Sequence, residues 1–197
     1  MKLLLIRHGE TDWNKEERIQ GREDIPLNET GILQAMNCGK ALKGGNFAAI
    51  ISSPLGRARK TAEIIKEVVA IDKLIIDNDL IEKDFDKISG MTYKERKEFD
   101  ASGQVAKRET REAILKRMLR SIFKHANEFY DKDIIIVSHG AAIRSVIDEY
   151  TDGELTKSKR ILGNTSISVL NYDGKDITAG VYNMSGEEYR GKYGTDK

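Results

Sequence analysis

The chain has 197 residues, of which 39% are apolar and 33% carry a charge, a composition typical of one globular domain with a substantial core. Its 33 basic and 32 acidic residues leave a net charge of +1, which gives no general reason to expect nucleic acid or a membrane as a partner. The single cysteine, Cys38, excludes an intrachain disulfide and a cysteine-based structural zinc site.

A continuously apolar run at residues 3–6 predicts a buried first strand. This run is too short for the core of a signal peptide or for a membrane span, so we expect a cytoplasmic protein. Further short apolar runs predict strands at residues 48–51, 74–76 and 133–137. Apolar residues at helical spacing predict helices over residues 28–42, 54–69, 110–130 and 141–150, the second of them beginning at Pro54.

The end of the chain departs from this alternation. Residues 166–172 and 176–182 predict a hairpin around Asp173 and Gly174. The elements together predict an α/β fold, a three-layer α/β/α sandwich with a mostly parallel mixed sheet and one antiparallel edge. We expect a single domain over residues 1–185, a charged surface excursion or lid at residues 84–108, and a polar, frayed tail at residues 186–197.

Two of the three histidines directly follow predicted strands. Arg7, His8 and Gly9 come after the first strand, and His139 and Gly140 follow the strand at residues 133–137. Ligands of open α/β sheets bind at the carboxyl ends of the strands. The repeated pattern of strand, histidine and glycine therefore predicts a functional site, whereas the third histidine, in the middle of the helix at residues 110–130, is expected to be structural.

A basic segment opens the helix that follows the second strand, with Arg57 in its first turn. Free N–H groups and the helix dipole favour anions at this position, so a cation there calls for an anionic partner, which an arginine can bind through two hydrogen bonds. An acidic loop at residues 79–85 follows the third strand and offers several carboxylates, one of which could serve as a proton donor.

These segments resemble the histidine phosphatase superfamily, in its phosphoglycerate mutase-like branch. The most specific match is the run Arg7-His8-Gly9-Glu10-Thr11 at the end of the first strand. Further matches follow in the family's order and span residues 3 to about 170: Trp13-Asn14, Gln20-Gly21, Asp24-Ile25-Pro26-Leu27, Gly31, Ser52-Ser53-Pro54, Arg57-Ala58, Thr61-Ala62, Leu80-Ile81-Glu82 and Ser138-His139-Gly140.

The resemblance implies a role for each matched residue. It implies a phosphate pocket of Arg7, His8, Arg57 and His139, with His8 as nucleophile and Glu82 as general acid. For His8 to attack, one ring nitrogen must be unprotonated, so we expect the other to donate to a fixed acceptor such as a backbone carbonyl. Substrate-binding residues are implied at Thr11, Asn14, Gln20, Gly21 and Gly140, with Asn14 expected nearest to the phosphate.

The chain departs from the family in the acidic loop and beyond it. Family members often carry Phe-Gly-x-Trp-x-Gly there, but residues 85–90 read FDKISG and lack that glycine and the tryptophan. Asp84 and Asp86 therefore compete with Glu82 for the acid role. The segment between Met91 and Thr110 is short compared with the long insertion of the glycolytic mutases, which favours a phosphatase over a mutase.

The resulting hypothesis is an acid-type histidine phosphatase, a phosphomonoesterase that acts on a small phosphorylated metabolite through a phosphohistidine. We expect no metal and no cofactor, because fixed cations supply the positive charge, and a monomer or homodimer. The alcohol half of the substrate stays open among sugar phosphates, phosphoglycerates and the ribazole phosphate of cobalamin assembly. Two alternatives remain, a phosphoglycerate mutase and a catalytically inactive regulatory module that binds a phosphorylated ligand.

Overall fold

A computed structural model of the protein describes residues 1–194. Within these residues, six strands form one sheet in the order β3-β2-β4-β1-β5-β6. The strands are β1 (Lys2–Arg7), β2 (Phe47–Ser52), β3 (Leu74–Ile76), β4 (Asp133–Ser138), β5 (Ile167–Tyr172) and β6 (Ile177–Ala179). Strands β3, β2, β4 and β1 run parallel to one another, and β5 and β6 form the antiparallel edge.

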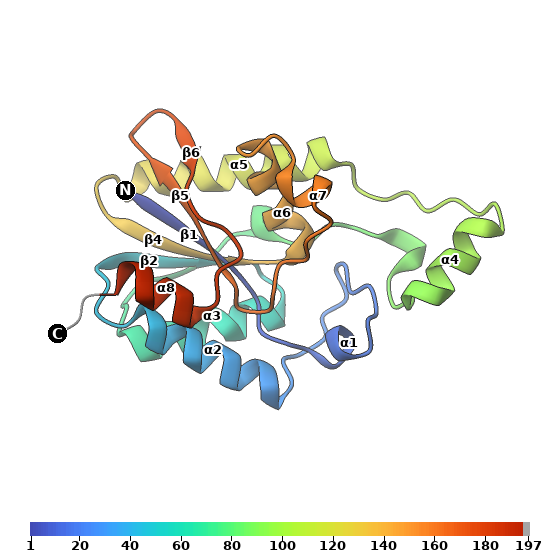
Figure 1. Ribbon diagram of the computed structural model, residues 1–197, viewed down its shortest axis with the longest axis horizontal. Helices are drawn as coiled ribbons and strands as arrows, with labels where there is room; N and C mark the ends of the chain where they lie inside the picture. Colours follow the sequence, from blue (N-terminus) through green and yellow to red (C-terminus); the bar gives the residue numbers. More distant parts are fainter. Residues whose placement is uncertain (195–197) are drawn as a thin grey trace.

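Alternate residues of the central strands point to opposite faces of the sheet, so each face has its own core. On β1, Leu3 and Leu5 pack with helices α5 (Arg111–Glu128) and α6 (Gly140–Glu149). Leu4 and Ile6 face α2 (Glu29–Leu42) and α3 (Gly56–Val69) instead. Figure 1 shows the sheet between these two helical layers, which confirms the expected three-layer α/β/α sandwich.

The strand register brings three chain segments to one edge of the sheet. Arg7, the last residue of β1, pairs with Ser138 of β4, and Ser52 of β2 pairs with Val137. The residues that follow these strands are His8, Ser53 and His139. Hydrogen-bonded strands lie about 4.8 Å apart, so these three residues lie side by side although the sequence separates them widely.

The sequence places the main elements correctly and misses the short ones. Helix α3 begins at Gly56 rather than at Pro54, because Leu55 has the extended backbone of an N-cap. The second hairpin strand is shorter than residues 176–182. The elements without a clear sequence pattern are α1 (Asp12–Lys15), the 3₁₀ turns at Asn78–Leu80 and Asp86–Ile88, α4 (Tyr93–Ala101) and α7 (Glu154–Lys157).

The segment at residues 84–108 is a surface excursion, as expected. Figure 1 shows it extending away from the sheet on the side where β1, β2 and β4 end, with α4 at its tip. Ile88 and Phe99 are its buried apolar side chains, and most of its other residues are half-buried or exposed. In residues 1–194, no helix is both long enough and apolar enough to cross a membrane.

The expectation of a frayed tail from residue 186 is wrong. Residues 186–193 form helix α8 (Gly186–Tyr193), which has a capping box between Ser185 and Glu188. Its Tyr189 is 6% exposed and packs into the core beside α2, where it is grouped with Cys38 and Leu42. Tyr193 packs against the same core from a partly buried position, and Arg190 donates to the carbonyl of Lys40 on α2, so α8 is docked on α2. The remainder of the expected tail, residues 195–197, lies outside the described residues.

Candidate active site

His8 lies at the end of β1 with a ring that is 2% exposed. Its Nδ1 is 2.7 Å from the carbonyl oxygen of Gly9, so Nδ1 carries the proton and donates it, as expected for a nucleophile that attacks through Nε2. Nε2 accepts a hydrogen bond of 3.2 Å from Nε of Arg57. Burial, followed by the charges of Arg7 and Arg57, holds the pKa of His8 well below its usual value, which keeps the imidazole neutral.

His139 lies beside His8, with a distance of 5.2 Å between the ring centroids. Its Nε2 is 2.7 Å from Oγ of Ser53, and the same oxygen accepts a hydrogen bond from the Leu55 N–H. We assign the Ser53 hydroxyl as donor to Nε2, which places the proton of His139 on Nδ1. That Nδ1 is buried and has no partner among the described residues. Burial and the nearby Arg57 lower the pKa of His139 well below its usual value.

Arg7 supplies a second buried donor that has no partner. One terminal nitrogen of its guanidinium donates to the carbonyl of Leu162, but Nε is buried and unpartnered within residues 1–194. Gly140 lies next to this Nε, since a Cβ on Gly140 would be 3.6 Å from it, an ordinary van der Waals contact. Burial lowers the pKa of Arg7 from its usual value, and Glu82 opposes this effect. Arg7 and His139 therefore present unpartnered N–H groups at the same strand ends.

The sequence predicts a guanidinium on Arg57 that is free to bind an anion through two hydrogen bonds, but the structure shows it bonded to backbone carbonyls. Its side chain is fully buried, and its terminal nitrogens donate to the carbonyl oxygens of Glu23, at 2.6 Å, and Gly21, at 2.7 Å. It therefore does not present an open two-pronged contact to an anion. Burial lowers its pKa to about 10, so the guanidinium remains positively charged near neutral pH. Arg57 therefore holds a fixed positive charge next to the imidazole of His8.

The carboxyl group of Glu82 accepts hydrogen bonds from backbone N–H groups at the start of α6. Oε1 accepts hydrogen bonds from the N–H groups of Lys83, at 2.7 Å, and Ala142, at 3.0 Å, while Oε2 accepts from Ala141, at 3.1 Å. Free N–H groups at a helix N-terminus are favourable partners for a carboxylate. This position holds the carboxyl group in the wall of the same cavity as His8.

Asp84 and Asp86, the other two candidates for the acid role, lie outside the cavity. Asp84 accepts from the backbone N–H of Asp86, and Asp86 accepts from the backbone N–H of Lys107. Neither residue lines the cavity that contains His8, whereas Glu82 does. Among the three residues considered for the acid role, the geometry therefore selects Glu82.

A cavity of about 570 Å³ is lined by Arg7, His8, Arg57 and Glu82, whereas His139 lies buried behind this lining. Four of the residues expected to bind substrate line it: Asn14, Gln20, Gly21 and Gly140. Gly21 has a φ of +54°, a left-handed conformation that favours glycine. Thr11 does not line the cavity. Its side chain is fully buried and caps α1.

Two residues of the site have roles that the sequence does not reveal. Ser53 belongs to a recognised motif, but its contact with His139 depends on the register of β2 and β4. Asn164, in the loop before β5, donates from Nδ2 to the carbonyl of His8 and to Oδ1 of Asn14, both at 3.1 Å. It joins the entrance loop to the strand that carries the histidine, and no sequence pattern marks it.

The remaining singled-out residues have structural roles, as expected. His125 is buried on α5, where its Nε2 lies 2.9 Å from Oδ2 of Asp77, which also accepts from Ser121. Cys38 is buried in the core under α2 and α3, and burial raises the pKa of its thiol to about 12. None of these residues lines the cavity over His8.

Comparisons with known proteins agree with this geometry. A family model described as "Histidine phosphatase superfamily (branch 1)" matches residues 3–185. "Uncharacterized phosphatase PhoE" of Bacillus subtilis (strain 168) is 35% identical over 170 residues, which cover 86% of this chain and 88% of that protein. "Probable phosphoglycerate mutase GpmB" of Photorhabdus laumondii is 31% identical over 184 residues, covering 87% and 85% of the two chains.

The similarity extends to solved structures. The structure titled "Bacillus stearothermophilus YhfR" superposes with a TM-score of 0.84 at 28% identity, covering 93% of this chain and 96% of that chain. The family match extends over the whole segment that supplies His8, Arg57, Glu82 and His139. The chain therefore belongs to the histidine phosphatase superfamily, branch 1.

Proposed function

We propose that this protein is a phosphomonoesterase in which Nε2 of His8 takes the phosphoryl group from a small metabolite. One observation carries the proposal: among residues 1–194, Nε of Arg7 and Nδ1 of His139, which bears a proton in the form assigned above, are buried without a partner beside a neutral His8. Buried donors are almost always hydrogen-bonded, so two unpartnered donors at neighbouring strand ends beside His8 support a ligand rich in acceptor atoms. The oxygens of a phosphate dianion meet this requirement.

In the first step, the lone pair on Nε2 attacks phosphorus in line with the ester oxygen. An Nε2–P bond forms and the P–O bond to the alcohol breaks. Glu82, in its protonated form, gives its proton to the leaving oxygen, so that an alcohol departs rather than an alkoxide. Arg7, Arg57 and His139 stabilise the charge on the equatorial oxygens.

In the second step, a water molecule attacks phosphorus of the phosphohistidine. The carboxylate of Glu82 takes a proton from this water, and the Nε2–P bond breaks. His8 returns to its neutral form with the proton on Nδ1, held by the Gly9 carbonyl. The products are the alcohol and inorganic phosphate, and every proton is accounted for.

A phosphoglycerate mutase is the second candidate within this family, and relatives of the chain carry both names. A mutase must keep water away from the phosphohistidine while its product rebinds. The segment at residues 91–110 holds only the nine residues of α4 as regular structure, and Figure 1 shows it extended away from the sheet. This arrangement supports the phosphatase.

The test measures phosphate hydrolysis and phosphoglycerate isomerisation on the same enzyme preparation. With 3-phosphoglycerate as substrate, we expect release of inorganic phosphate to exceed formation of 2-phosphoglycerate, and the opposite ratio would favour the mutase. With p-nitrophenyl phosphate and a panel of sugar phosphates, we expect turnover that His8→Ala abolishes. No turnover on any substrate would reject the proposal in favour of an inactive binding module.

A further inference from the structure

We propose that Arg117, on α5, is a positioning residue for the general acid: it holds the backbone that carries Glu82, so that the carboxyl group reaches the leaving oxygen of the substrate. This inference rests on the proposed phosphatase function, in which Glu82 protonates that oxygen. Arg117 does not line the cavity over His8, so it acts through Glu82 and does not touch the substrate.

The segment that carries Glu82 has no regular secondary structure of its own. The 3₁₀ turn at Asn78–Leu80 ends just before it, and residues 81–85 belong to no helix or strand. Carbonyl groups in such a segment are not engaged by a helix or a sheet, so buried ones need other donors. The position of Glu82 therefore depends on side chains that reach the backbone around it.

The guanidinium of Arg117 supplies these donors. Its Nη1 donates to the carbonyl oxygen of Asp79, at 2.8 Å, and also to that of Ile81, the residue directly before Glu82. Nε and Nη2 donate to Oε1 and Oε2 of Glu109, at 2.8 Å and 3.0 Å, which makes a two-pronged ion pair. Because the guanidinium is planar and rigid, this ion pair fixes the direction in which Nη1 points.

Glu109 holds the other side of the same segment. Its Oε2 accepts from the backbone N–H of Asp84, at 3.2 Å, and its own N–H donates to the Asp84 carbonyl, at 2.9 Å. Burial acts to raise the pKa of Glu109, but hydrogen bonds from Arg117 and Asp84 outweigh it and lower the pKa overall. Glu109 therefore stays ionised near neutral pH, and Glu82 is anchored on both sides.

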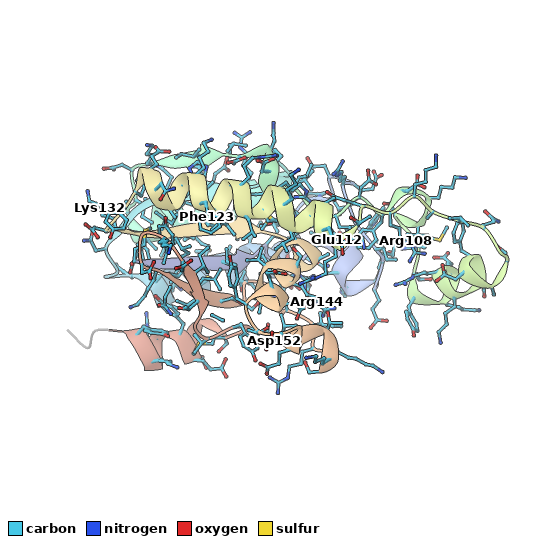
Figure 2. All side chains as sticks on the ribbon, turned by 90° about the horizontal axis from the view of Figure 1, so that it is seen from above. Arg108, Glu112, Phe123, Lys132, Arg144 and Asp152 are labelled. Atoms are coloured by element: carbon cyan, nitrogen blue, oxygen red, sulfur yellow. The ribbon has the colours of Figure 1, made fainter. Side chains whose placement is uncertain are left out.

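The start of α5 borders the active site. Its Ile114 lines the cavity over His8. Figure 2 shows this end of α5, marked by Glu112, beside the surface excursion at residues 84–108. Arg117 follows Ile114 by three residues, about one helical turn, so it lies next to the cavity wall without being part of it.

Arg117 and Arg120 both reach the segment from α5, but in different ways. The side chains of Arg117 and Glu109 are 11% and 13% exposed, so solvent screens their ion pair only weakly. Arg120 is 62% exposed and donates to the carboxylate of Asp79, a surface ion pair of the kind that contributes little. Arg120 therefore provides a matched control for Arg117.

The experiment compares two substrates that differ in how much their leaving oxygen needs a proton. p-Nitrophenyl phosphate releases a phenolate that the nitro group stabilises, whereas phenyl phosphate releases a more basic phenolate and depends more on the acid. The readout is the ratio of kcat/KM for p-nitrophenyl phosphate to kcat/KM for phenyl phosphate. Hydrolysis of the phosphohistidine does not enter kcat/KM, because it follows release of the phenol. A loss of folded protein cancels in the ratio.

Arg117→Lys keeps a positive charge for Glu109 but loses the rigid fork that joins Glu109 to the two carbonyls. We expect the ratio to rise about 10-fold, a part of the roughly 100- to 10,000-fold that a general acid contributes. Arg120→Lys makes the same change on the same helix and should keep the wild-type ratio. An unchanged ratio in Arg117→Lys, or an equal rise in Arg120→Lys, would overturn the positioning role.

A double-mutant cycle with Glu82→Gln separates positioning from a general structural role. Glutamine cannot give up a proton, so in this background Arg117→Lys should change kcat/KM for phenyl phosphate by less than about 2-fold. A loss as large as in the wild-type background would show that Arg117 acts independently of Glu82 and would overturn the inference. Failure of the phosphatase proposal looks different, since the wild-type protein would then hydrolyse neither substrate.

Discussion

His8 and Arg57 are joined by a hydrogen bond of 3.2 Å from Nε of the arginine to Nε2 of the imidazole. The bond engages the lone pair that attacks phosphorus in the proposed mechanism, so it must open as the substrate phosphate enters. Both partners are buried, and the arginine is also anchored by the carbonyls of Gly21 and Glu23. In the proposed mechanism Arg57 therefore positions His8 and supplies positive charge to the phosphate.

The first prediction concerns this anchored guanidinium. Arg57→Lys keeps a positive charge but cannot donate to His8, Gly21 and Glu23 together, so we expect kcat to fall about 100-fold or more, as for other preorganised charge-stabilising groups. Steady-state hydrolysis of p-nitrophenyl phosphate measures this. Arg59→Lys, on the exposed face of the same helix, is the control and should retain activity. Wild-type kcat in Arg57→Lys would remove the side chain from the mechanism.

The second prediction concerns the protonation of His8. Its pKa is lowered by burial and by two arginines, so the neutral form with the proton on Nδ1 should persist as the pH falls through 6.5, where an exposed histidine gains its second proton. Nitrogen-15 spectra of the three imidazoles, assigned with His8→Asn, can follow this. A titration of His8 near pH 6.5, or a proton on Nε2, would contradict the assignment.

The third prediction concerns Ser53, which we consider a positioning residue for His139. Ser53→Ala removes the donor to Nε2, so His139 is no longer held with its proton on Nδ1 and should populate both neutral forms. We expect kcat to fall about 3- to 10-fold, the usual effect of one hydrogen bond. The imidazole nitrogen shifts of His139 report the change of form directly. An unchanged nitrogen spectrum would show that Ser53 does not select the form. Ser52→Ala, at the adjacent buried serine, is the control.

The fourth prediction concerns the stability provided by α8. Tyr189→Ala removes a buried ring from the core beside α2, so we expect a loss of about 3 kcal/mol in the free energy of unfolding. Urea unfolding measures it. Tyr93→Ala, at an exposed tyrosine, should change stability by less than about 0.5 kcal/mol. Equal stabilities of the two variants would mean that α8 is not docked in solution.

Much of the site could be predicted because it lies at strand ends. A buried strand followed by a histidine and a glycine is visible in the sequence for both His8 and His139, and the register of β1 and β4 then brings them together. The α/β sandwich follows from the same alternation of apolar runs and helical periodicity. The resemblance favours Glu82 for the acid role, although Asp84 and Asp86 offer the same chemistry in the sequence, and of the three only Glu82 lines the cavity.

The rest depends on contacts between segments that the sequence does not relate. Asn164 reaches the backbone of His8 from more than 150 residues away, and no local pattern marks it. Thr11 was assigned to the substrate entrance, although its hydroxyl is used to cap α1. Helix α8 is not visible in the sequence because its amphipathic pattern is weak, and only Tyr189 of its eight residues is fully buried.

The most direct test of the account is rapid acid-free quenching of the enzyme during turnover of p-nitrophenyl phosphate, followed by mass spectrometry under alkaline conditions that preserve phosphohistidine. We predict a phosphoryl group on the peptide that contains His8, absent from His8→Ala, together with a burst of p-nitrophenol no larger than one equivalent per site. Sustained turnover with no phosphoryl group on that peptide would contradict nucleophilic attack by His8.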